Sequence, residues 1–186
     1  MEQKKVTYMG ADTQDVTEQL EAGNEKMAAK GVTLDWNIIT NIGEDDGCTD
    51  ACVELAEAGC DIIFSDSYGH QPYMLQAARE YEDITFVSCT GDMAATSGLD
   101  NYKNLFPYTY ESRYVSGVVA GMKLKELMDA GTVTDPYVGY VGAFPYAEVV
   151  SGYTAFLLGI QSIVPEAYME VQYTNSWFDL AGEAEA

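Results

Sequence analysis

The stretch Cys60-Asp61-Ile62-Ile63-Phe64-Ser65-Asp66-Ser67-Tyr68-Gly69-His70 decides the fold of this chain. Its apolar centre is too short for a lone helix and too continuous to alternate, which is typical of a strand covered on both faces. A polar turn with a glycine follows at once, and residues 71–81 then have the composition of a helix. A buried strand that leads through a polar turn into a helix predicts an α/β fold with a parallel sheet.

The same alternation of strands and helices runs along the rest of the chain. Strands are predicted over residues 5–9, 34–40, 61–65, 84–89, 105–110, 137–142 and 169–174, and helices over 15–30, 49–58, 71–81, 112–130 and 147–164. This order predicts βαβ units. We expect an N-terminal α/β lobe over residues 1–110 and the beginning of a second α/β lobe over 111–186, truncated at its C-terminus.

The composition is that of an acidic globular protein. Hydrophobic residues make up 47% of the 186 residues, enough for a substantial core. The formal net charge of -21 argues against nucleic acid and anionic membrane surfaces as partners. The cysteines match no CxxC pair or zinc ribbon. We expect small buried or half-buried thiols at Cys48 and Cys52, with a disulfide or a metal site as the alternative, and core residues at Cys60 and Cys89.

The sequence gives little support to catalysis. It contains no GxSxG elbow, HExxH or P-loop motif, and His70 is its only histidine. Asp66 and Ser67 stand too close to His70 in the sequence to surround it as a triad usually does. We therefore predict no catalytic residue, no metal site and no cofactor, and keep an enzyme of the flavodoxin-like or sugar-processing type only as an alternative.

Polar and aromatic residues follow four of the predicted strands. In an open parallel sheet, ligands bind in the crevice outside the carboxyl ends of the strands. Carboxylates can accept hydrogen bonds from the vicinal hydroxyls of a sugar, and aromatic rings stack on flat groups. The asparagine amide can both donate hydrogen bonds to a ligand and accept them from it. The sequence thus predicts the binding of a small polar molecule. The candidate residues are Asp66, Ser67, Tyr68, Thr90, Gly91, Asp92, Phe144, Asn175 and Trp177.

Each of these candidates also has a purely structural interpretation. Asp66 could cap the following helix, since Ser and Asp are ordinary residues at that position. The segment 90–92 could be a hinge or a turn without any contact to a ligand. Phe144 and Trp177 could serve packing alone. These alternatives stay open at the level of the residues.

Five segments of the chain, in the same order, resemble signatures of one family. They are DIIFSDSYGH (61–70), FVSCTG (86–91), YESRYVSGVVAG (110–121), GYVGAFPYAEVVSG (139–152) and NSWFD (175–179). The family is the basic membrane protein (BMP, PnrA-like) family of ABC-transporter substrate-binding lipoproteins. The resemblance covers the chain from about residue 46 to its end.

The resemblance implies a fold and a function. It implies a type I periplasmic-binding fold, with two Rossmann-like lobes of parallel sheet, and a solute-binding component of an ABC transporter. The expected ligand is a purine nucleoside or similar small polar molecule, bound between the two lobes, and the expected partner is an ABC permease in the membrane. The full-length protein is expected to be an extracytoplasmic, membrane-anchored lipoprotein. A ligand-sensing receptor or regulator domain of the same fold is the alternative.

The resemblance also assigns roles to the candidate residues. Those that would face the ligand are Asp66, Ser67, Tyr68 and Phe144. The segment 90–92 would lie near the hinge side, and Trp177 with Asn175 would supply stacking and a polar edge. The segment 8–15 matches the family poorly, and Asp12 and Asp15 would stand where the family carries an acidic ligand cluster.

Overall fold

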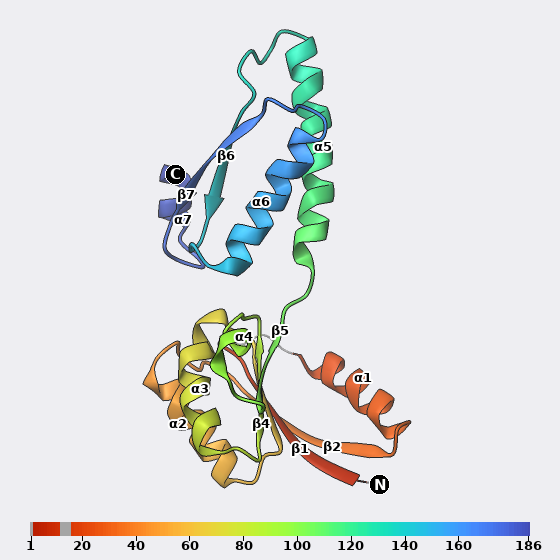
Figure 1. Cartoon of the computed structure of the whole chain (residues 1–186), viewed down its shortest axis with the longest axis vertical. Helices are drawn as coiled ribbons and strands as arrows, with labels where there is room; N and C mark the ends of the chain where they lie inside the picture. Colours follow the sequence, from red (N-terminus) through yellow and green to blue (C-terminus); the bar gives the residue numbers. More distant parts are fainter. Residues whose placement is uncertain (1, 12–15) are drawn as a thin grey trace. The chain divides into compact units, whose positions relative to one another are not determined.

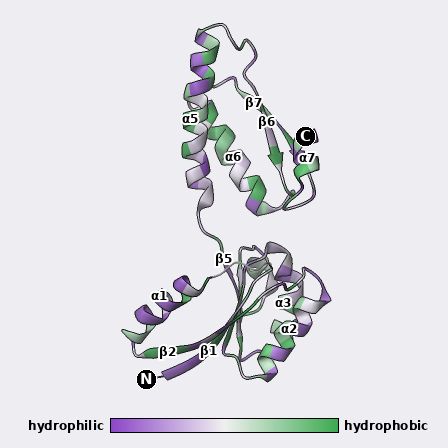
Figure 2. Cartoon of the chain, turned by 180° about the vertical axis from the view of Figure 1, so that it is seen from behind, coloured by the Kyte–Doolittle hydropathy of each residue, from purple (hydrophilic) through white to green (hydrophobic). Residues whose placement is uncertain are grey.

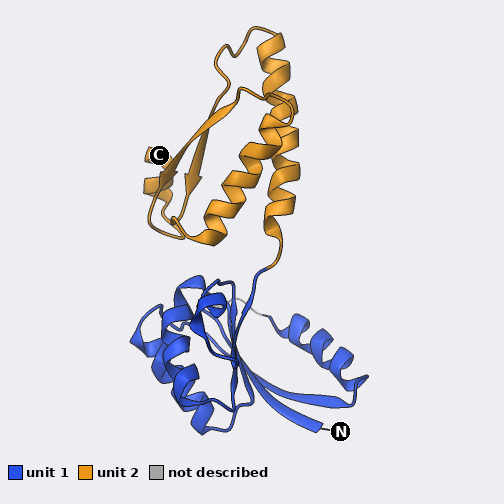
Figure 3. Ribbon diagram, in the orientation of Figure 1, with its two compact units in different colours: residues 1–106 blue, residues 107–186 orange. Residues whose placement is uncertain are grey.

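The computed structural model of the protein describes residues 2–11 and 16–186. The chain divides into two compact units, residues 1–106 (unit 1) and residues 107–186 (unit 2), which Figure 3 shows in different colours. Both units combine strands with helices.

The described part of unit 1 contains a parallel sheet of five strands. The strands are β1 (Glu2–Met9), β2 (Val32–Ile39), β3 (Ile62–Ser65), β4 (Thr85–Cys89) and β5 (Tyr102–Leu105), in the spatial order β2-β1-β3-β4-β5. The chain runs from β1 outward to β2 and then returns past β1 to β3. The order of the strands therefore reverses between β1 and β3, which is the topological switch point of the sheet.

Helices cover both faces of this sheet. The helical segments are α1 (Thr17–Ala28), α2 (Asp46–Glu57), the short 3₁₀ turn η1 (Tyr68–His70), α3 (Gln71–Glu80) and α4 (Ala94–Ser97). Figure 1 shows α2 and α3 on one side of the sheet and α1 on the other. Figure 2 shows that α1 is largely hydrophilic, and none of its residues is buried. The core of unit 1 thus lies mainly under α2 and α3.

That core contains three of the cysteines. Cys48, Cys52 and Cys60 are buried beside Ile63 and Phe86, and all four cysteines of the chain are free thiols. Hydrogen bonding with Cys48, together with burial, raises the pKa of Cys52 well above its ordinary value. The predictions of free thiols at Cys48 and Cys52 and of a core residue at Cys60 are confirmed, whereas Cys89 is only half-buried at the end of β4.

Unit 2, which is described throughout, pairs two parallel strands and packs two long helices against each other. Its elements are α5 (Thr109–Asp129), β6 (Tyr137–Gly142), α6 (Ala147–Gln161), β7 (Tyr168–Tyr173) and α7 (Leu180–Glu185). The packing of α5 on α6 depends on glycine, because a Cβ atom at Gly117 would overlap the Phe156 carbonyl oxygen. A Cβ atom at Gly159 would likewise overlap the Tyr114 carbonyl oxygen.

One predicted element is wrong. The segment 105–110 is not extended as a whole, since β5 ends at Leu105 and α5 begins at Thr109. In β5 the side chains alternate, with Tyr102 buried and Lys103 exposed, as expected for an edge strand. The polar residues of such a strand hide it from a search for continuous apolar runs. None of the helices in the described part of the chain is long and apolar enough to cross a membrane.

Candidate functional site

Asp66 lies at the switch point of the unit 1 sheet. Its Oδ2 atom accepts a hydrogen bond from the Tyr8 hydroxyl at 2.7 Å, and its Oδ1 atom accepts one from the Ala11 backbone N–H at 2.8 Å. Tyr8 belongs to β1 and Asp66 follows β3, so the carboxylate joins the carboxyl ends of these two neighbouring strands. This is the place where open α/β sheets bind ligands.

The helix-cap interpretation of Asp66 is wrong, because the cap is its neighbour. Ser67 precedes η1, and its Oγ atom accepts a hydrogen bond from the Gly69 backbone N–H at 3.3 Å. The same hydroxyl donates to the Glu44 carboxylate, and the Ser67 residue is 8% exposed. Ser67 is therefore held inward, whereas Asp66 is only half-buried.

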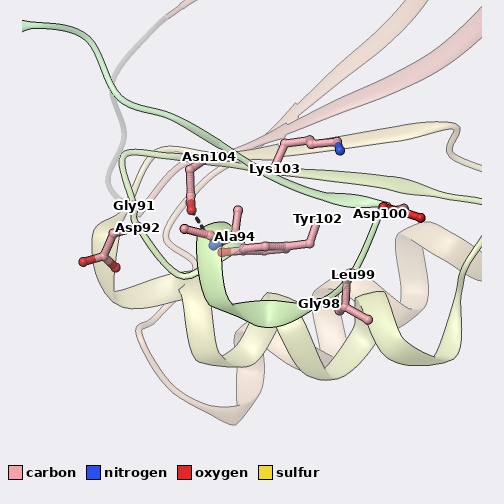
Figure 4. A pocket seen from close by; sticks show the side chains of 10 residues that line it. Gly91, Asp92, Ala94, Gly98, Leu99, Asp100, Tyr102, Lys103 and Asn104 are labelled. Carbon is pink, nitrogen blue, oxygen red and sulfur yellow. Dashed lines mark hydrogen bonds between the residues drawn. The ribbon is translucent and has the colours of Figure 1, made fainter.

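Tyr68 and Asp92 come together from two adjacent strand ends. The Tyr68 hydroxyl donates a hydrogen bond to Asp92 Oδ2 at 2.8 Å. Tyr68 opens η1 after β3, and Asp92 stands three residues beyond the end of β4. Asp92 is exposed, and in Figure 4 its carboxylate points away from the neighbouring hollow. The pair presents a phenol and a carboxylate at the same edge of the sheet as Asp66.

Thr90 and Gly91 are the first two residues of the loop after β4. The Thr90 carbonyl accepts a hydrogen bond from Ser88 Oγ at 2.8 Å. Gly91 is buried, and a Cβ atom there would overlap the amide groups of Gln71 and Asn104. A larger residue at position 91 would therefore displace these two side chains.

The sequence analysis missed Gln71, which is fully buried beneath this loop. Its Oε1 atom accepts hydrogen bonds from the backbone N–H groups of Asp92 at 2.8 Å and Met93 at 2.9 Å. A polar residue in the first turn of a helix is unremarkable in a sequence. The signal that could have found it is the pair of consecutive polar residues, His70 and Gln71, directly before an apolar helix face.

His70 has a structural position in this network. Its Nε2 atom lies 2.9 Å from the Ile42 carbonyl oxygen, and its Nδ1 atom lies 2.6 Å from Ser65 Oγ. Because a carbonyl only accepts, Nε2 carries a proton, and in the neutral ring Nδ1 accepts from the Ser65 hydroxyl. Both ring nitrogens are thus engaged in holding the loop after β2 to the end of β3.

The negative charge of Asp66 also acts on the half-buried thiol of Cys89. Burial, and then the charge of Asp66, raises the pKa of Cys89 to about 11. The thiol is therefore neutral at physiological pH, and it behaves as a small, polarisable apolar group.

A hollow of about 710 Å³ lies at the β4–β5 side of unit 1. Figure 4 shows that the Asn104 amide points to α4, where its Oδ1 atom accepts a hydrogen bond from the Ala94 backbone N–H at 2.7 Å. Of the predicted ligand residues, two border this hollow, Gly91 and Asp92.

Unit 2 carries an aromatic cluster at the carboxyl ends of β6 and β7. The Phe144 ring stacks on Tyr146 with centroids 5.0 Å apart and planes 11° apart, and Trp177 meets Phe144 edge-on at 5.2 Å. Trp177 packs against Phe144 and Tyr146 and is still 49% exposed, which suits a stacking surface. Asn175 is exposed in the left-handed region at φ 55°.

A hollow of about 460 Å³ adjoins Trp177 and is bordered by the ends of β6 and β7. Tyr146 belongs to the aromatic cluster although it is absent from the predicted ligand residues. Asp12 and Asp15 lie outside the described residues. Within residues 2–11 and 16–186, no group of three or more His, Cys, Asp or Glu side chains could hold a metal ion.

Known proteins resemble this chain over most of its length. A purine-binding protein of Brucella abortus (strain 2308) is 32% identical over 166 residues, which are 89% of this chain and 44% of that protein. A putative ABC transporter glucose-binding protein of Haloferax volcanii is 33% identical over 126 residues, which are 68% of this chain and 29% of that protein. The chain thus spans less than half the length of either relative.

Among solved structures, an ABC transporter solute-binding protein from Conexibacter woesei DSM 14684 superimposes with a TM-score of 0.60 at 22% identity. The match covers 98% of this chain and 58% of that one. The predicted α/β fold of the periplasmic-binding type is therefore confirmed. The regulator alternative is not favoured, because the family that matches residues 12–186 is described as ABC transporter substrate-binding protein PnrA-like. The chain belongs to this PnrA-like family, as its five sequence signatures predicted.

Proposed function

We propose that the protein binds a purine nucleoside or similar small polar molecule, as the extracytoplasmic solute-binding component of an ABC transporter. The observation that carries this proposal is the gathering of Asp66, Tyr68 and Asp92 at the carboxyl ends of β3 and β4, beside the switch point. The family supports the transporter class, and the name of the Brucella relative supports a purine.

The polar groups of unit 1 suit the ribose of such a ligand. The carboxylates of Asp66 and Asp92 can each accept hydrogen bonds from vicinal hydroxyls, and bonds to charged groups contribute about 1.5–3 kcal/mol each. Each Asp66 oxygen already accepts one bond from the protein and keeps a further lone pair. Those bonds fix the carboxylate before the ligand arrives. The backbone of the 90–92 loop and the Ser67 turn would complete this polar surface.

The aromatic residues of unit 2 suit the purine base. A base stacked on an aromatic side chain gains about 1–3 kcal/mol. Trp177 is about half exposed and packs against the Phe144 ring, and the Asn175 amide can form hydrogen bonds with the edge of a base. We assign stacking to Trp177 and Phe144 and a polar contact to Asn175. The proposed action is binding and release, with delivery to an ABC permease in the membrane.

Isothermal titration calorimetry of the full-length protein tests this proposal. The panel consists of guanosine, inosine, ribose, glucose and leucine, and we expect binding heat with the two nucleosides and little or none with leucine. No heat with either purine nucleoside would overturn the nucleoside assignment. Heat with glucose alone would instead favour a sugar ligand, to which the name of the Haloferax relative points.

We also propose a lipid anchor on the intact protein, which labelling of cells with a radioactive fatty acid would test.

A further inference from the structure

We propose that Gln71 is a positioning residue for ligand binding, because its buried amide sets the location of the Tyr68–Asp92 pair. This inference rests on the proposed function, since it assumes that the pair contacts the ligand. Gln71 itself is fully buried and is not expected to touch the ligand.

The Gln71 amide joins two strand-end loops. Its Oε1 atom accepts hydrogen bonds from two successive backbone N–H groups after β4, those of Asp92 at 2.8 Å and Met93 at 2.9 Å. Its Nε2 atom donates to the Tyr68 carbonyl oxygen at 3.2 Å, which belongs to the turn after β3. The loop after β4 therefore wraps around the Gln71 Oε1 atom. The hydrogen bond to the Tyr68 carbonyl in the turn after β3 fixes the orientation of this amide.

Three hydrogen bonds close a ring through the proposed ligand pair. Gln71 binds the backbone of Tyr68 and the backbone of Asp92, and the Tyr68 hydroxyl binds the Asp92 carboxylate at 2.8 Å. Neither member of the pair can shift without stretching a bond to Gln71 or to the other member. Ordering of binding groups in advance lowers the entropic cost of association.

Only a side-chain amide of the length of glutamine can form both hydrogen bonds to the backbone of Tyr68 and Asp92. The position needs an acceptor for two N–H groups and a donor for one carbonyl group on the same planar group. Glutamate would keep the acceptor and set a negative charge against the Tyr68 carbonyl, and leucine would leave all these backbone groups without their partner. Asn104 supports the arrangement, because its Nδ2 atom donates to Gln71 Oε1 at 3.2 Å.

A matched control, Asn101, lies at the opposite ends of the strands. Asn101 precedes β5, and its Nδ2 atom donates to the carbonyl oxygens of Ala78, Tyr81 and Ile84 at 2.8, 3.0 and 3.1 Å. It is also a partly buried amide that holds loops together, but it stands at the amino ends of the strands, away from the proposed ligand groups. Asn101→Leu therefore removes a comparable network without reaching the pair.

The experiment measures guanosine affinity, thermal stability and hydrogen exchange in the full-length protein for Gln71→Leu, Gln71→Glu and Asn101→Leu. We expect Gln71→Leu to weaken guanosine binding by roughly tenfold or more and Gln71→Glu to weaken it less, because the loss of a hydrogen-bonded positioning group is of this order. Asn101→Leu should lower the melting temperature and leave the affinity unchanged. Only the two Gln71 variants should speed amide exchange in the segment 91–93.

The outcomes separate this inference from the proposed function. If the unaltered protein binds guanosine and Gln71→Leu binds it equally tightly, the inference is overturned while the proposed function stands. If the unaltered protein binds no nucleoside, the proposed function fails, and the inferred role of Gln71 in nucleoside binding fails with it. Exchange in the segment 91–93 then still decides whether Gln71 holds the loop. Should Gln71→Leu fail to fold, Gln71→Glu gives the same comparison.

Discussion

The Tyr8 hydroxyl lies 2.7 Å from Asp66 Oδ2, and this bond joins the carboxyl ends of β1 and β3 at the point where the strand order reverses. The carboxylate is thereby fixed by β1 while it remains half-buried. Tyr8 was not among the predicted site residues, since the segment that contains it matches the family poorly.

Asp66→Asn should weaken guanosine binding by about 10- to 100-fold, because a neutral amide replaces a charged acceptor of ribose hydroxyls. Calorimetric titration measures the change. Asp35→Asn is the matched control, since Asp35 is an exposed carboxylate on β2 of the same sheet and should leave binding unaltered. Equal affinities for Asp66→Asn and the unaltered protein would remove Asp66 from the site.

Trp177→Ala should weaken nucleoside binding by about 1–3 kcal/mol, the usual contribution of one stacked base. Tyr168→Ala serves as its control. Tyr168 also belongs to a ring pair of unit 2, with Tyr137 at 5.4 Å, but that pair stands at the amino ends of β6 and β7. Affinity that falls equally in both variants would argue for general destabilisation of unit 2 instead of stacking.

Gly91→Ala should reproduce the binding loss of Gln71→Leu. The added methyl group would overlap Gln71 Oε1 and Asn104 Nδ2 and force the amide out of its ring of hydrogen bonds. We expect an affinity loss of about tenfold and faster amide exchange at Asp92 and Met93. Gly98→Ala tests strain alone, because that glycine has open space around it but a positive φ of 70°. It should lower stability without weakening binding.

Cys89 should react slowly with iodoacetamide at pH 8. Its pKa is raised from the ordinary value of 9.0 to about 11, so the reactive thiolate is roughly a hundredfold scarcer than for an ordinary cysteine. Because the folded pKa lies above the unfolded one, the group's contribution to stability is present below pH 9 and is lost as the pH rises towards 11. Mass spectrometry of labelled peptides measures the rate.

The companion variant for this measurement is Asp66→Asn, which removes the second cause of the raised pKa and leaves burial, the larger one. Labelling of Cys89 should then become moderately faster. A rate in the unaltered protein equal to that of the urea-unfolded chain would contradict the raised pKa.

Gly117→Ala should destabilise unit 2 by about 1–3 kcal/mol, because the methyl group has no room against the Phe156 carbonyl oxygen and the helices must separate. Urea unfolding monitored by tryptophan fluorescence and circular dichroism measures the loss. Gly139→Ala is the control, since nothing lies within 4 Å of its added Cβ atom. Similar losses for the two variants would mean that close helix contact is not the cause.

The elements that could be predicted from the sequence are those with an unbroken signal. The apolar run 62–64 and the strand 137–142 were placed correctly, because neither contains a charged residue and both are rich in residues that favour strands. β5 was misplaced because only Tyr102 of its four residues enters the core. The sequence showed which strand ends are polar, and the parallel sheet then sets β3 beside β4.

What the sequence could not supply is the direction of each side chain. Ser67 and Asp66 are neighbours of similar chemistry, yet one turns inward to Glu44 and caps η1 while the other reaches to Tyr8. Gln71 shows the same limit, because the two groups that its Oε1 atom holds after β4 are backbone N–H groups, which leave no mark in the amino-acid pattern.

The glycine contacts between α5 and α6 have a mechanical consequence. Where two main chains touch, there is no layer of flexible side chains to absorb a displacement, so a force applied along one helix is passed directly to the other. In a single-molecule pulling experiment α5 and α6 would therefore unfold together in one step.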